Sequence, residues 1–469
     1  MKIIKNDKKN NKIKVSVLIS TYNKEKFIKK TLDSILNQTM DKSDFEIIVV
    51  DDCSTDSTPD IVSKQVENFV NYQFVQLDEN SGTPAEPRNL SIDLSKGKYI
   101  MFIDGDDWLP SDAIEKLYTL LKSNKTDYAT GLTKYVYTDH IARSGVALSK
   151  IAHKKVDLKN FRKSFYHLAP AGRMIKSSVI KKNKIRFPEM IYGEDLQFFA
   201  EVFFNTKNIS TTQDVVYCAN RYDENISLVK SEESTVVNRM KWQNEAYRYL
   251  INKYKNNRIF TSLLYRIINK DILEGKFYKK QFIKEIDMLL PVFQDILNII
   301  DKDFNSLDYV DDELNQQAIK LIKNGNKQEI IDFVNFYLKK DDKQLHVLND
   351  KYYYSYNGNS YKKRMHVTLQ KIFQKDENIF LKLHSKNSEL KYLEIKSRKD
   401  PTNYTVLKIK KNLFKSGEYT VQFQTNELPK GKLALTVLDE NLNGSVIKSG
   451  MQFNFYETVN GNLGYVKKE

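Results

Sequence analysis

The chain has 469 residues, of which 41% are hydrophobic and 29% are charged. Its length predicts two or three domains, and its 28 Tyr and 25 Phe, against only 16 Gly and 9 Pro, exclude a wholly disordered protein. No apolar run approaches the roughly 20 residues that cross a bilayer. The apolar stretch behind the basic N-terminus is too short for a signal peptide, so we expect a cytoplasmic protein.

The net charge of +15 favours a polyanionic partner, such as nucleic acid, an anionic membrane face or a phosphate-rich polymer. A lysine-rich surface that only keeps the protein in solution explains the same charge, so composition does not choose among these. The two cysteines, Cys53 and Cys218, predict neither a disulfide framework nor a zinc site.

The first 130 residues alternate strand-like and helix-like patterns, which predicts crossover units and a mostly parallel sheet in an α/β domain. The predicted strands are 15–20, 45–50, 72–77 and 99–103, and the predicted helices are 26–38, 61–69, 87–94 and 113–122. Ligands of such sheets bind beyond the carboxyl ends of the strands. Unusual polar clusters follow several of these strands, so we expect the site there.

The rest of the chain changes pattern twice, which predicts three domains: 1–230, 231–340 and 341–469. Residues 130–225 complete the first domain with mixed structure. Apolar spacing predicts helices at 236–254, 259–273 and 317–339. Short alternating segments and turns at Asn357-Gly358-Asn359 and Asn443-Gly444 predict an immunoglobulin-like β-sandwich, with strands at 352–356, 365–369, 404–409, 419–423 and 433–437.

The strongest chemical signal is Asp104-Gly105-Asp106-Asp107 at the end of a predicted strand. Closely placed carboxylates repel each other and are tolerated when a hard divalent cation lies between them and a phosphate. This pattern predicts a seat for Mg²⁺ or Mn²⁺ bound to a diphosphate. A solvated turn explains the same residues equally well, because Asp-Gly is common in turns.

Two further clusters follow predicted strands. Asp51-Asp52 supplies a carboxylate for the N–H of a base or a ribose hydroxyl, although it also suits the capping of the next helix. The segment from Asn80 to Asn89 combines a flexible turn with Arg88, which can bind a phosphate or brace a carboxylate. Each of these signals is weak by itself.

Glu194 and Asp195 precede the apolar residues of a predicted helix. Acids at a helix N-terminus are ordinary, because they interact favourably with the helix dipole. The alternative interpretation is a general base at the rim of a site.

Together and in this order, these motifs resemble the family 2 glycosyltransferases of the GT-A fold. The resemblance covers about residues 13–230, and it is strongest to the wall teichoic acid glycosyltransferases of staphylococci. It is carried by Val15–Asn23 with Thr21-Tyr22-Asn23, Val49–Asp56, Asn80-Ser81-Gly82, Pro87-Arg88-Asn89, Phe102–Asp107, Glu194-Asp195-Leu196-Gln197-Phe198 and Arg221–Ser227. A helical region followed by a β-sandwich is also similar to these enzymes.

The resemblance implies an inverting, metal-dependent transfer of N-acetylglucosamine from UDP-GlcNAc to ribitol hydroxyls of polyribitol phosphate, with Mn²⁺ or Mg²⁺ as the cation. It implies that Asp52 holds the uracil, that Asp106 binds the metal with Asp104 in its shell or at the ribose, and that Asp195, with Glu194 beside it, is the general base. The other implied donor contacts are Ser20, Tyr22, Asn80, Arg88, Gly105, Arg221 and Ser227. The related enzymes carry Pro in place of Ser20 and Ser in place of Gly105, where we expect a harmless change because the position presents backbone.

The acceptor implied by the resemblance accounts for the net positive charge of the chain, because every repeat of the polymer carries a negatively charged phosphodiester. We expect Lys154, Lys155, Arg173 and Lys176 to help seat it, with no role for nucleic acid and with at most peripheral contact with the inner membrane face. The β-sandwich is expected either to bind polymer or to hold a homo-oligomer, a trimer by resemblance. The alternatives are a capsule or exopolysaccharide transferase using another UDP-sugar, and a non-catalytic polyanion-binding protein; intact metal and base positions disfavour the latter.

Overall fold

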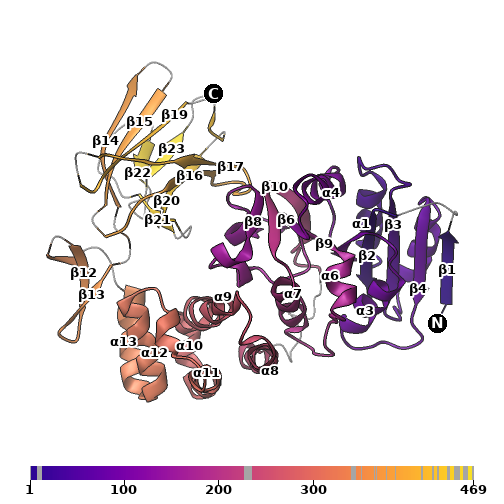
Figure 1. Ribbon diagram of the computed structural model, residues 1–469, viewed down its shortest axis with the longest axis horizontal. Helices are drawn as coiled ribbons and strands as arrows, with labels where there is room; N and C mark the ends of the chain where they lie inside the picture. The colour runs from indigo at the N-terminus through magenta and orange to yellow at the C-terminus, as the bar shows by residue number, and fades with distance from the viewer. Residues whose placement is uncertain are drawn as a thin grey trace. The chain divides into compact units, whose positions relative to one another are not determined.

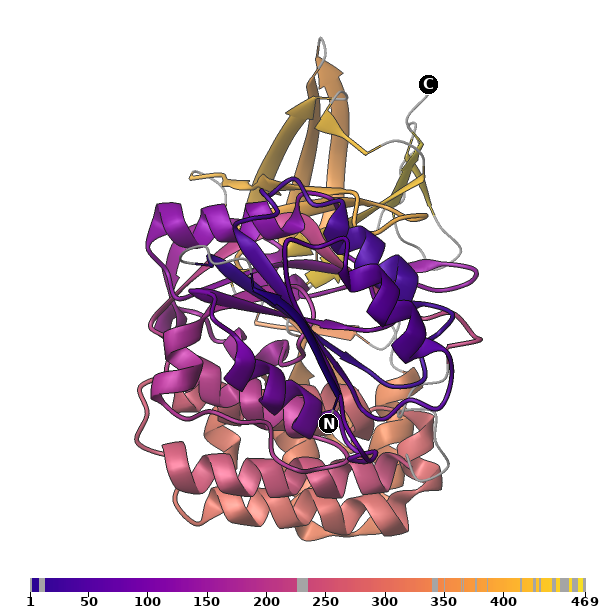
Figure 2. The ribbon, with the colours of Figure 1, turned by 90° about the vertical axis from the view of Figure 1, so that its right-hand side faces the viewer.

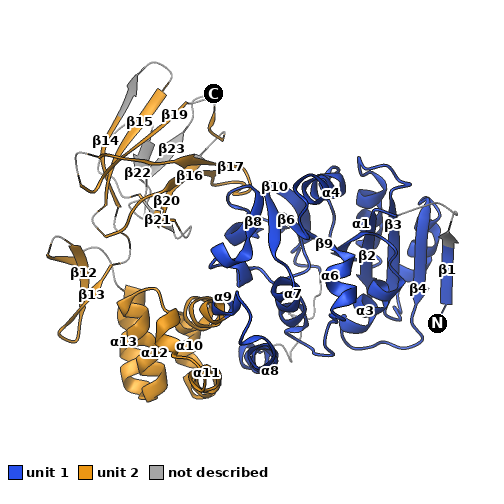
Figure 3. Ribbon diagram, in the orientation of Figure 1, with its two compact units in different colours: residues 1–263 blue, residues 264–469 orange. Residues whose placement is uncertain are grey.

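The computed structural model describes residues 2–7, 13–225, 235–339, 345–349, 351–363, 365, 367–375, 378–385, 387–413, 416–424, 427–429, 432–440, 444–447, 455–457 and 463–466. The chain forms two compact units, Met1–Leu263 and Leu264–Glu469 (Figure 3). The three domains 1–230, 231–340 and 341–469 remain a prediction.

The first unit is built on a ten-stranded sheet with the order β1-β4-β3-β2-β5-β9-β6-β10-β8, in which β7 pairs with β6 (Figure 1). Its strands are β1 Lys2–Asp7, β2 Val15–Thr21, β3 Phe45–Asp51, β4 Asn71–Gln76, β5 Tyr99–Asp104, β6 Tyr128–Val136, β7 Ile141–Ser144, β8 His153–Asp157, β9 Arg173–Lys176 and β10 Asn208–Asn220. Strands β4, β3, β2 and β5 are parallel neighbours, as are β6 and β10, whereas β1, β7, β8 and β9 run antiparallel to their neighbours.

Helices lie on both faces of this sheet, which Figure 2 views from the β1 edge. They are α1 Ile28–Leu36, α2 Thr58–Val66, α3 Ala85–Leu94, α4 Ala113–Asn124, α5 Val146–Ser149, α6 Ser177–Lys182 and α7 Glu194–Phe204, with short 3₁₀ turns at Leu158–Asn160 and Ser164–Tyr166. Helix α8, Val236–Tyr254, packs on α7. Helix α3 packs across β2 and β3, and α4 packs on β6 and β10. The α/β architecture is confirmed, and the predicted elements before residue 125 lie within a few residues of the observed ones.

The register of the central strands sets the position of the polar residues that follow them. Strands β2, β3 and β5 are apolar and buried because both faces of the sheet are covered. Thr21 pairs with Asp51, and Ser20 pairs with Asp104. The three strands therefore end at the same level, which brings the polar clusters to one edge of the sheet.

Helices continue into the second unit with α9 Phe260–Tyr265, a π-helix Arg266–Phe277, α10 Lys280–Lys284, α11 Ile286–Asp301, a 3₁₀ turn Ser306–Tyr309, α12 Glu313–Asn324 and α13 Lys327–Lys339. The prediction of one helix over 317–339 is wrong, because Gly325 has φ of 78° and its N–H caps Leu321. Among the described residues, no helix is long and apolar enough to cross a membrane.

The described residues of the second unit also form three antiparallel sheets. Sheet β11-β12-β13 is small, whereas β14-β15-β19-β18 and β17-β16-β20-β23-β22, with β21 beside β20, share one apolar core that includes Leu381, Leu393, Val421 and Leu435. The strands are β11 Leu345–Leu348, β12 Lys351–Tyr356, β13 Asn359–Lys362, β14 Val367–Lys375, β15 Asn378–Ser385, β16 Tyr392–Ser397, β17 Tyr404–Lys408, β18 Lys410–Lys411, β19 Glu418–Gln424, β20 Lys432–Leu438, β21 Gly444–Val446, β22 Phe455–Glu457 and β23 Leu463–Val466. This core confirms a C-terminal sandwich, although β15 and β16 are missing from the prediction.

The turn predicted at Asn357-Gly358 joins β12 to β13, with φ of 46° and 73° at its two central residues. Positive φ at both positions matches the right-handed twist of the hairpin strands. The turn predicted at Asn443-Gly444 includes Asn443, which lies outside the described residues.

Candidate active site

The Asp104–Asp107 turn begins at the last residue of β5 and is held by hydrogen bonds from β10. The Tyr217 hydroxyl donates to Asp107 Oδ2 at 2.7 Å and accepts the backbone N–H of Asp104 at 3.2 Å. The backbone N–H of Asn220 donates to Asp107 Oδ1 at 2.7 Å. Burial, with Asp106 nearby, raises the pKa of Asp107 well above its usual range. Asp107 is therefore a buried anchor, which leaves Asp104 and Asp106 as the carboxylates at the sheet edge.

We expect Tyr217→Phe to lower the free energy of unfolding by about 1 to 3 kcal/mol, because it removes a hydrogen bond from a buried partner. Urea denaturation measures this change. Tyr72→Phe is a matched control, because Tyr72 is largely buried and its hydroxyl has no hydrogen-bond partner among the described residues. Equal stability of the two variants would mean that Tyr217 does not anchor the turn.

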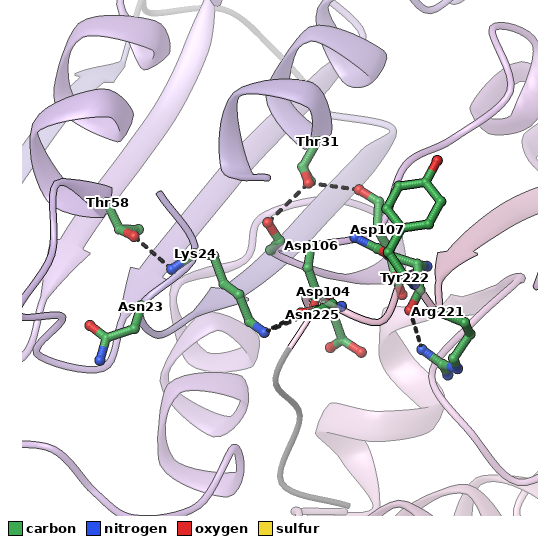
Figure 4. A network of polar contacts seen from close by, with 12 residues as sticks. Asn23, Lys24, Thr31, Thr58, Asp104, Asp106, Asp107, Arg221, Tyr222 and Asn225 are labelled. Atoms are coloured by element: carbon green, nitrogen blue, oxygen red, sulfur yellow. Dashed lines mark hydrogen bonds and ion pairs between the residues drawn. The ribbon is translucent and has the colours of Figure 1, made fainter. Parts of the chain in front are cut away.

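Asp106 lies in a triangle of polar groups (Figure 4). Lys24 Nζ is 2.8 Å from Asp106 Oδ2 and donates to Asn225 Oδ1 at 2.9 Å, while Asn225 Nδ2 donates to Asp106 Oδ2 at 3.0 Å. The Lys24 and Asp106 side chains are only 17% and 14% exposed. One oxygen of Asp106, the predicted metal-binding carboxylate, is therefore paired with the ammonium group of Lys24.

Arg88 joins the end of β5 to the start of α7. Its Nη2 is 3.0 Å from Asp104 Oδ1, and its Nη1 is 2.8 Å from Asp195 Oδ1 and 3.3 Å from Glu194 Oε1. The Arg88 side chain is 7% exposed and lies against the ring of Phe187. Three predicted site residues from two segments that are distant in the sequence thus meet on one guanidinium group, whose planar shape suits several carboxylates at once.

Helix α7 is fixed by its aromatic face. Phe198 stacks on Phe187 with a centroid distance of 3.8 Å, and both rings pack against Phe102 of β5. Gly193 precedes the helix with φ of 93°, a conformation that favours glycine. This packing delivers Glu194 and Asp195 to the sheet edge at the N-terminus of the helix.

The two carboxyl groups at the start of α7 have raised pKa values. Burial raises the pKa of Asp195 to about 8, although the ion pair with Arg88 acts in the opposite direction. Burial also raises the pKa of Glu194. The Asp195 side chain is 27% exposed against 11% for Glu194, so Asp195 is the more accessible to another molecule.

Asp52 is bound by the loop that follows β4. Its Oδ1 accepts the backbone N–H of Ser81 at 2.9 Å, and its Oδ2 accepts from the Ser81 hydroxyl at 3.0 Å and from Asn80 Nδ2 at 3.2 Å. A carboxylate oxygen has two lone pairs, so Oδ1 keeps capacity for one more donor. Asp52 and Asn80 are therefore neighbours, as the shared pocket predicted for them requires.

The predicted donor contacts at the end of β2 lie beside the Asp104–Asp107 turn. The Ser20 carbonyl accepts the N–H of Gly105 at 3.0 Å, and Tyr22 is 43% exposed just beyond the strand. A Cβ on Gly105 would lie 2.6 Å from Thr21 Oγ1, so a side chain there requires Thr21 to shift. The expectation that glycine in place of serine is harmless at this position stays a prediction.

Among the predicted basic residues, Arg221 lies near the acidic turn. Its Nη1 donates to the Asn220 carbonyl at 2.7 Å, and the Asp107, Asp104 and Asp106 charges raise its pKa although burial opposes them. Ser227 lies outside the described residues.

The expectation that Arg173 seats a polymer is wrong, because the residue is fully buried. Its guanidinium bonds to His167 and lies 4.5 Å from the ring centroid of Phe199. Lys176 pairs with Asp127 at 2.9 Å, and Lys154 and Lys155 are exposed.

The residues present fit a divalent cation only in part. Asp104 and Asp106 are hard oxygen donors, which Mg²⁺ and Mn²⁺ prefer. No group of three or more His, Cys, Asp or Glu side chains is arranged for a metal ion within the part of the chain that the structure describes. Such ions often combine one or two carboxylates with substrate phosphates, so the pair fits a cation shared with a diphosphate.

Carboxylates and basic side chains thus gather at the carboxyl edge of a central parallel sheet, beside a helix that supplies two more acids. This fold and site define a domain of the GT-A class. Residues 16–183 match the model of the family described as glycosyl transferase family 2, and they form a domain of that family.

Two relatives are most informative. The poly(ribitol-phosphate) beta-glucosyltransferase of Bacillus spizizenii is 38% identical over 206 residues, which are 44% of this chain and 32% of that protein. The poly(ribitol-phosphate) beta-N-acetylglucosaminyltransferase TarS of Staphylococcus aureus is 34% identical over 206 residues, which are 44% of this chain and 35% of TarS. The matching segment therefore spans about a third of each relative's length.

Crystal structures of S. aureus TarS share the fold. One covers 96% of this chain and 84% of that chain, with a TM-score of 0.61 at 18% identity. Residues 1–349 of TarS in complex with UDP-GlcNAc cover 75% of this chain and 99% of that chain, with a TM-score of 0.62 at 22% identity. The predicted resemblance to the teichoic acid glycosyltransferases is confirmed.

Sequence reasoning missed the residues that hold the acidic turn. Lys24 directly follows the Thr21-Tyr22-Asn23 motif, and Asn225 lies within the segment Arg221–Ser227, so both were close to recognised motifs. Tyr217 carries no local signal, because a Tyr in an apolar strand is ordinary core. Its role depends on the pairing of β10 with the rest of the sheet.

Proposed function

We propose that this chain is an inverting glycosyltransferase that moves a sugar from a UDP-sugar to a ribitol hydroxyl of polyribitol phosphate wall teichoic acid. The observation that carries the proposal is the Arg88 ion-pair cluster. It places Asp104, at the edge where a nucleotide binds in such folds, beside Asp195, which belongs to a different segment. A single displacement needs acidic groups on the donor side and on the acceptor side of one sugar.

In this reaction the acceptor oxygen bonds to the anomeric carbon while the bond from that carbon to the diphosphate oxygen breaks. The hydroxyl proton passes to a base as the new bond forms. We assign this role to Asp195, with Glu194 as its neighbour on Arg88. A pKa of about 8 gives Asp195 a basicity suited to proton transfer near neutral pH.

The donor side is assigned to residues at the strand ends. Asp52 would accept the uracil N–H through its remaining lone pair, with Asn80, Ser20, Tyr22 and Gly105 around it. Arg221 and Ser227 would contact the diphosphate, whose negative charge increases as it leaves. Mn²⁺ or Mg²⁺, held at Asp106 with Asp104 beside it, would neutralise part of that charge when bound.

The donor sugar is proposed to be N-acetylglucosamine, because the relative TarS is a poly(ribitol-phosphate) beta-N-acetylglucosaminyltransferase. Glucose is the second candidate, because the B. spizizenii relative is a glucosyltransferase.

The test incubates the purified chain and Mn²⁺ with polyribitol phosphate and either UDP-GlcNAc or UDP-glucose. We expect mass spectrometry to show N-acetylhexosamine on the polymer with the first donor and little hexose with the second. Polyglycerol phosphate, which lacks ribitol, is the matched acceptor control. Transfer of neither sugar to polyribitol phosphate would contradict the proposal.

The C-terminal sandwich is proposed to hold a homo-oligomer, most simply a trimer, rather than to bind polymer. Light scattering coupled to size exclusion measures the mass of the full chain in solution. A monomer at micromolar concentration would contradict this assignment and leave polymer binding as its alternative.

A further inference from the structure

The contact between Lys24 and Asp106 places a lysine on the carboxylate that the proposed function assigns to the cation. Lys24 Nζ is 2.8 Å from Asp106 Oδ2, and both side chains are largely shielded from water. Shielding strengthens the attraction between opposite charges relative to an exposed pair. A divalent cation that binds Asp106 must therefore compete with an ammonium group already in place.

The backbone that carries Lys24 is fixed. The N–H of Asn23 donates to Ser54 Oγ at 2.8 Å. The N–H of Lys24 donates to Thr58 Oγ1 at 2.7 Å (Figure 4). These bonds tie the loop after β2 to the start of α2. The ammonium group can consequently change partners by side-chain rotation alone, without movement of its loop.

Asn225 completes the arrangement from the other side of the site. It is 4% exposed and bonds to both members of the ion pair, and it lies four residues after Arg221 in the segment proposed to contact the diphosphate. A diphosphate arriving at Arg221 would therefore come close to the Lys24–Asp106 pair. Phosphate oxygens are strong acceptors for an ammonium group.

We propose that Lys24 is a positioning residue that pairs with Asp106 before the donor binds and passes to the donor diphosphate when the donor and a divalent cation bind. Lys24 thereby makes cation binding depend on the nucleotide. The inference rests on the proposed function, because it needs a cation shared between Asp106 and a diphosphate. It adds a device that opposes cation binding when no donor is present.

The experiment measures Mn²⁺ binding to the full chain by calorimetry, without nucleotide and with saturating UDP. We expect Lys24→Met to bind Mn²⁺ without UDP roughly 10-fold more tightly than wild type, within the range usual for coupled sites. With saturating Mn²⁺, the same variant should bind UDP more weakly, because the diphosphate loses a cationic partner. Lys24→Arg keeps the charge and should resemble wild type.

Lys26→Met is the matched control, because Lys26 is an exposed lysine two residues along the same loop. Far-ultraviolet circular dichroism of each variant verifies that it is folded. Equal Mn²⁺ affinity of Lys24→Met and Lys26→Met without UDP, together with UDP-dependent Mn²⁺ binding by wild type, would overturn the role of Lys24 and leave the proposed function standing. No Mn²⁺ binding by wild type even with UDP would overturn both this inference and the metal part of the proposed function.

Discussion

Asp195→Asn is expected to reduce sugar transfer by about 10²- to 10⁴-fold, the usual contribution of a general base, while UDP-sugar affinity changes little. The reason is that Asp195 belongs to α7, whereas the groups assigned to the nucleotide lie at or after the ends of β2, β3, β4, β5 and β10. Turnover is measured with polyribitol phosphate, and donor affinity is measured by calorimetry. Glu189→Gln is the matched control, because Glu189 is an exposed carboxylate just before the same helix.

The pH dependence gives an independent check on Asp195. A base must be ionised to accept a proton, so kcat/KM should rise with pH and level off above about 8, where Asp195 titrates. The raised pKa also means that Asp195 contributes stability at low pH which is lost as pH rises from about 4 to about 8. The stability of Asp195→Asn relative to wild type should therefore increase over this range. Near-normal turnover of Asp195→Asn would remove Asp195 from the base role.

Arg88→Met is expected to lower the free energy of unfolding by about 3 kcal/mol, near the lower limit for breaking a buried ion pair. The guanidinium compensates three carboxylates, but Asp104 is 36% exposed and water replaces part of the lost interaction there. Glu194 and Asp195 are less accessible, so most of the penalty falls on them. Transfer activity should fall as well, because Arg88 orients Asp195. Urea denaturation and transfer assays measure the two effects.

The decrease in the free energy of unfolding caused by Arg88→Met should depend on pH. Arg88 lowers the pKa of both Glu194 and Asp195 against the larger effect of burial, so without it these carboxyls hold their protons to higher pH. The deficit should be smallest at acidic pH, well below 8, where Asp195 is protonated, and largest above pH 8, where Asp195 is ionised. Arg186→Met is the control, because Arg186 forms a largely exposed pair with Asp93, and such pairs contribute at most about 1 kcal/mol. A deficit equal to that of the control at every pH would contradict the bridging role of Arg88.

Much of the first unit was predictable because its signals are local. The apolar composition of segments such as 45–50 and 99–103 predicts strands. Parallel strands that end at the same level bring the residues that follow them to one edge of the sheet. Asp52 and Asp104 lie at the ends of neighbouring strands, and Arg88 joins Asp104 to Asp195, while the roles assigned to these residues stay predictions. In the second unit the helix break at Gly325 and the strands β15 and β16 were missed, although Asn324-Gly325 was a readable stop signal.

The amino-acid sequence by itself determined the class of fold and the edge of the sheet at which the polar residues of the candidate site gather. It did so because hydrophobic periodicity and strand-end motifs are properties of short segments. Only the tertiary structure decided which charges meet. Arg88 bonds to Asp195, which is 107 residues away in the sequence, and Lys24 bonds to Asn225, which is 201 residues away. Arg173 is fully buried, although a basic residue is usually expected at the surface. The local sequence around a charged side chain does not predict its partner, because the packing of distant segments decides which charges meet.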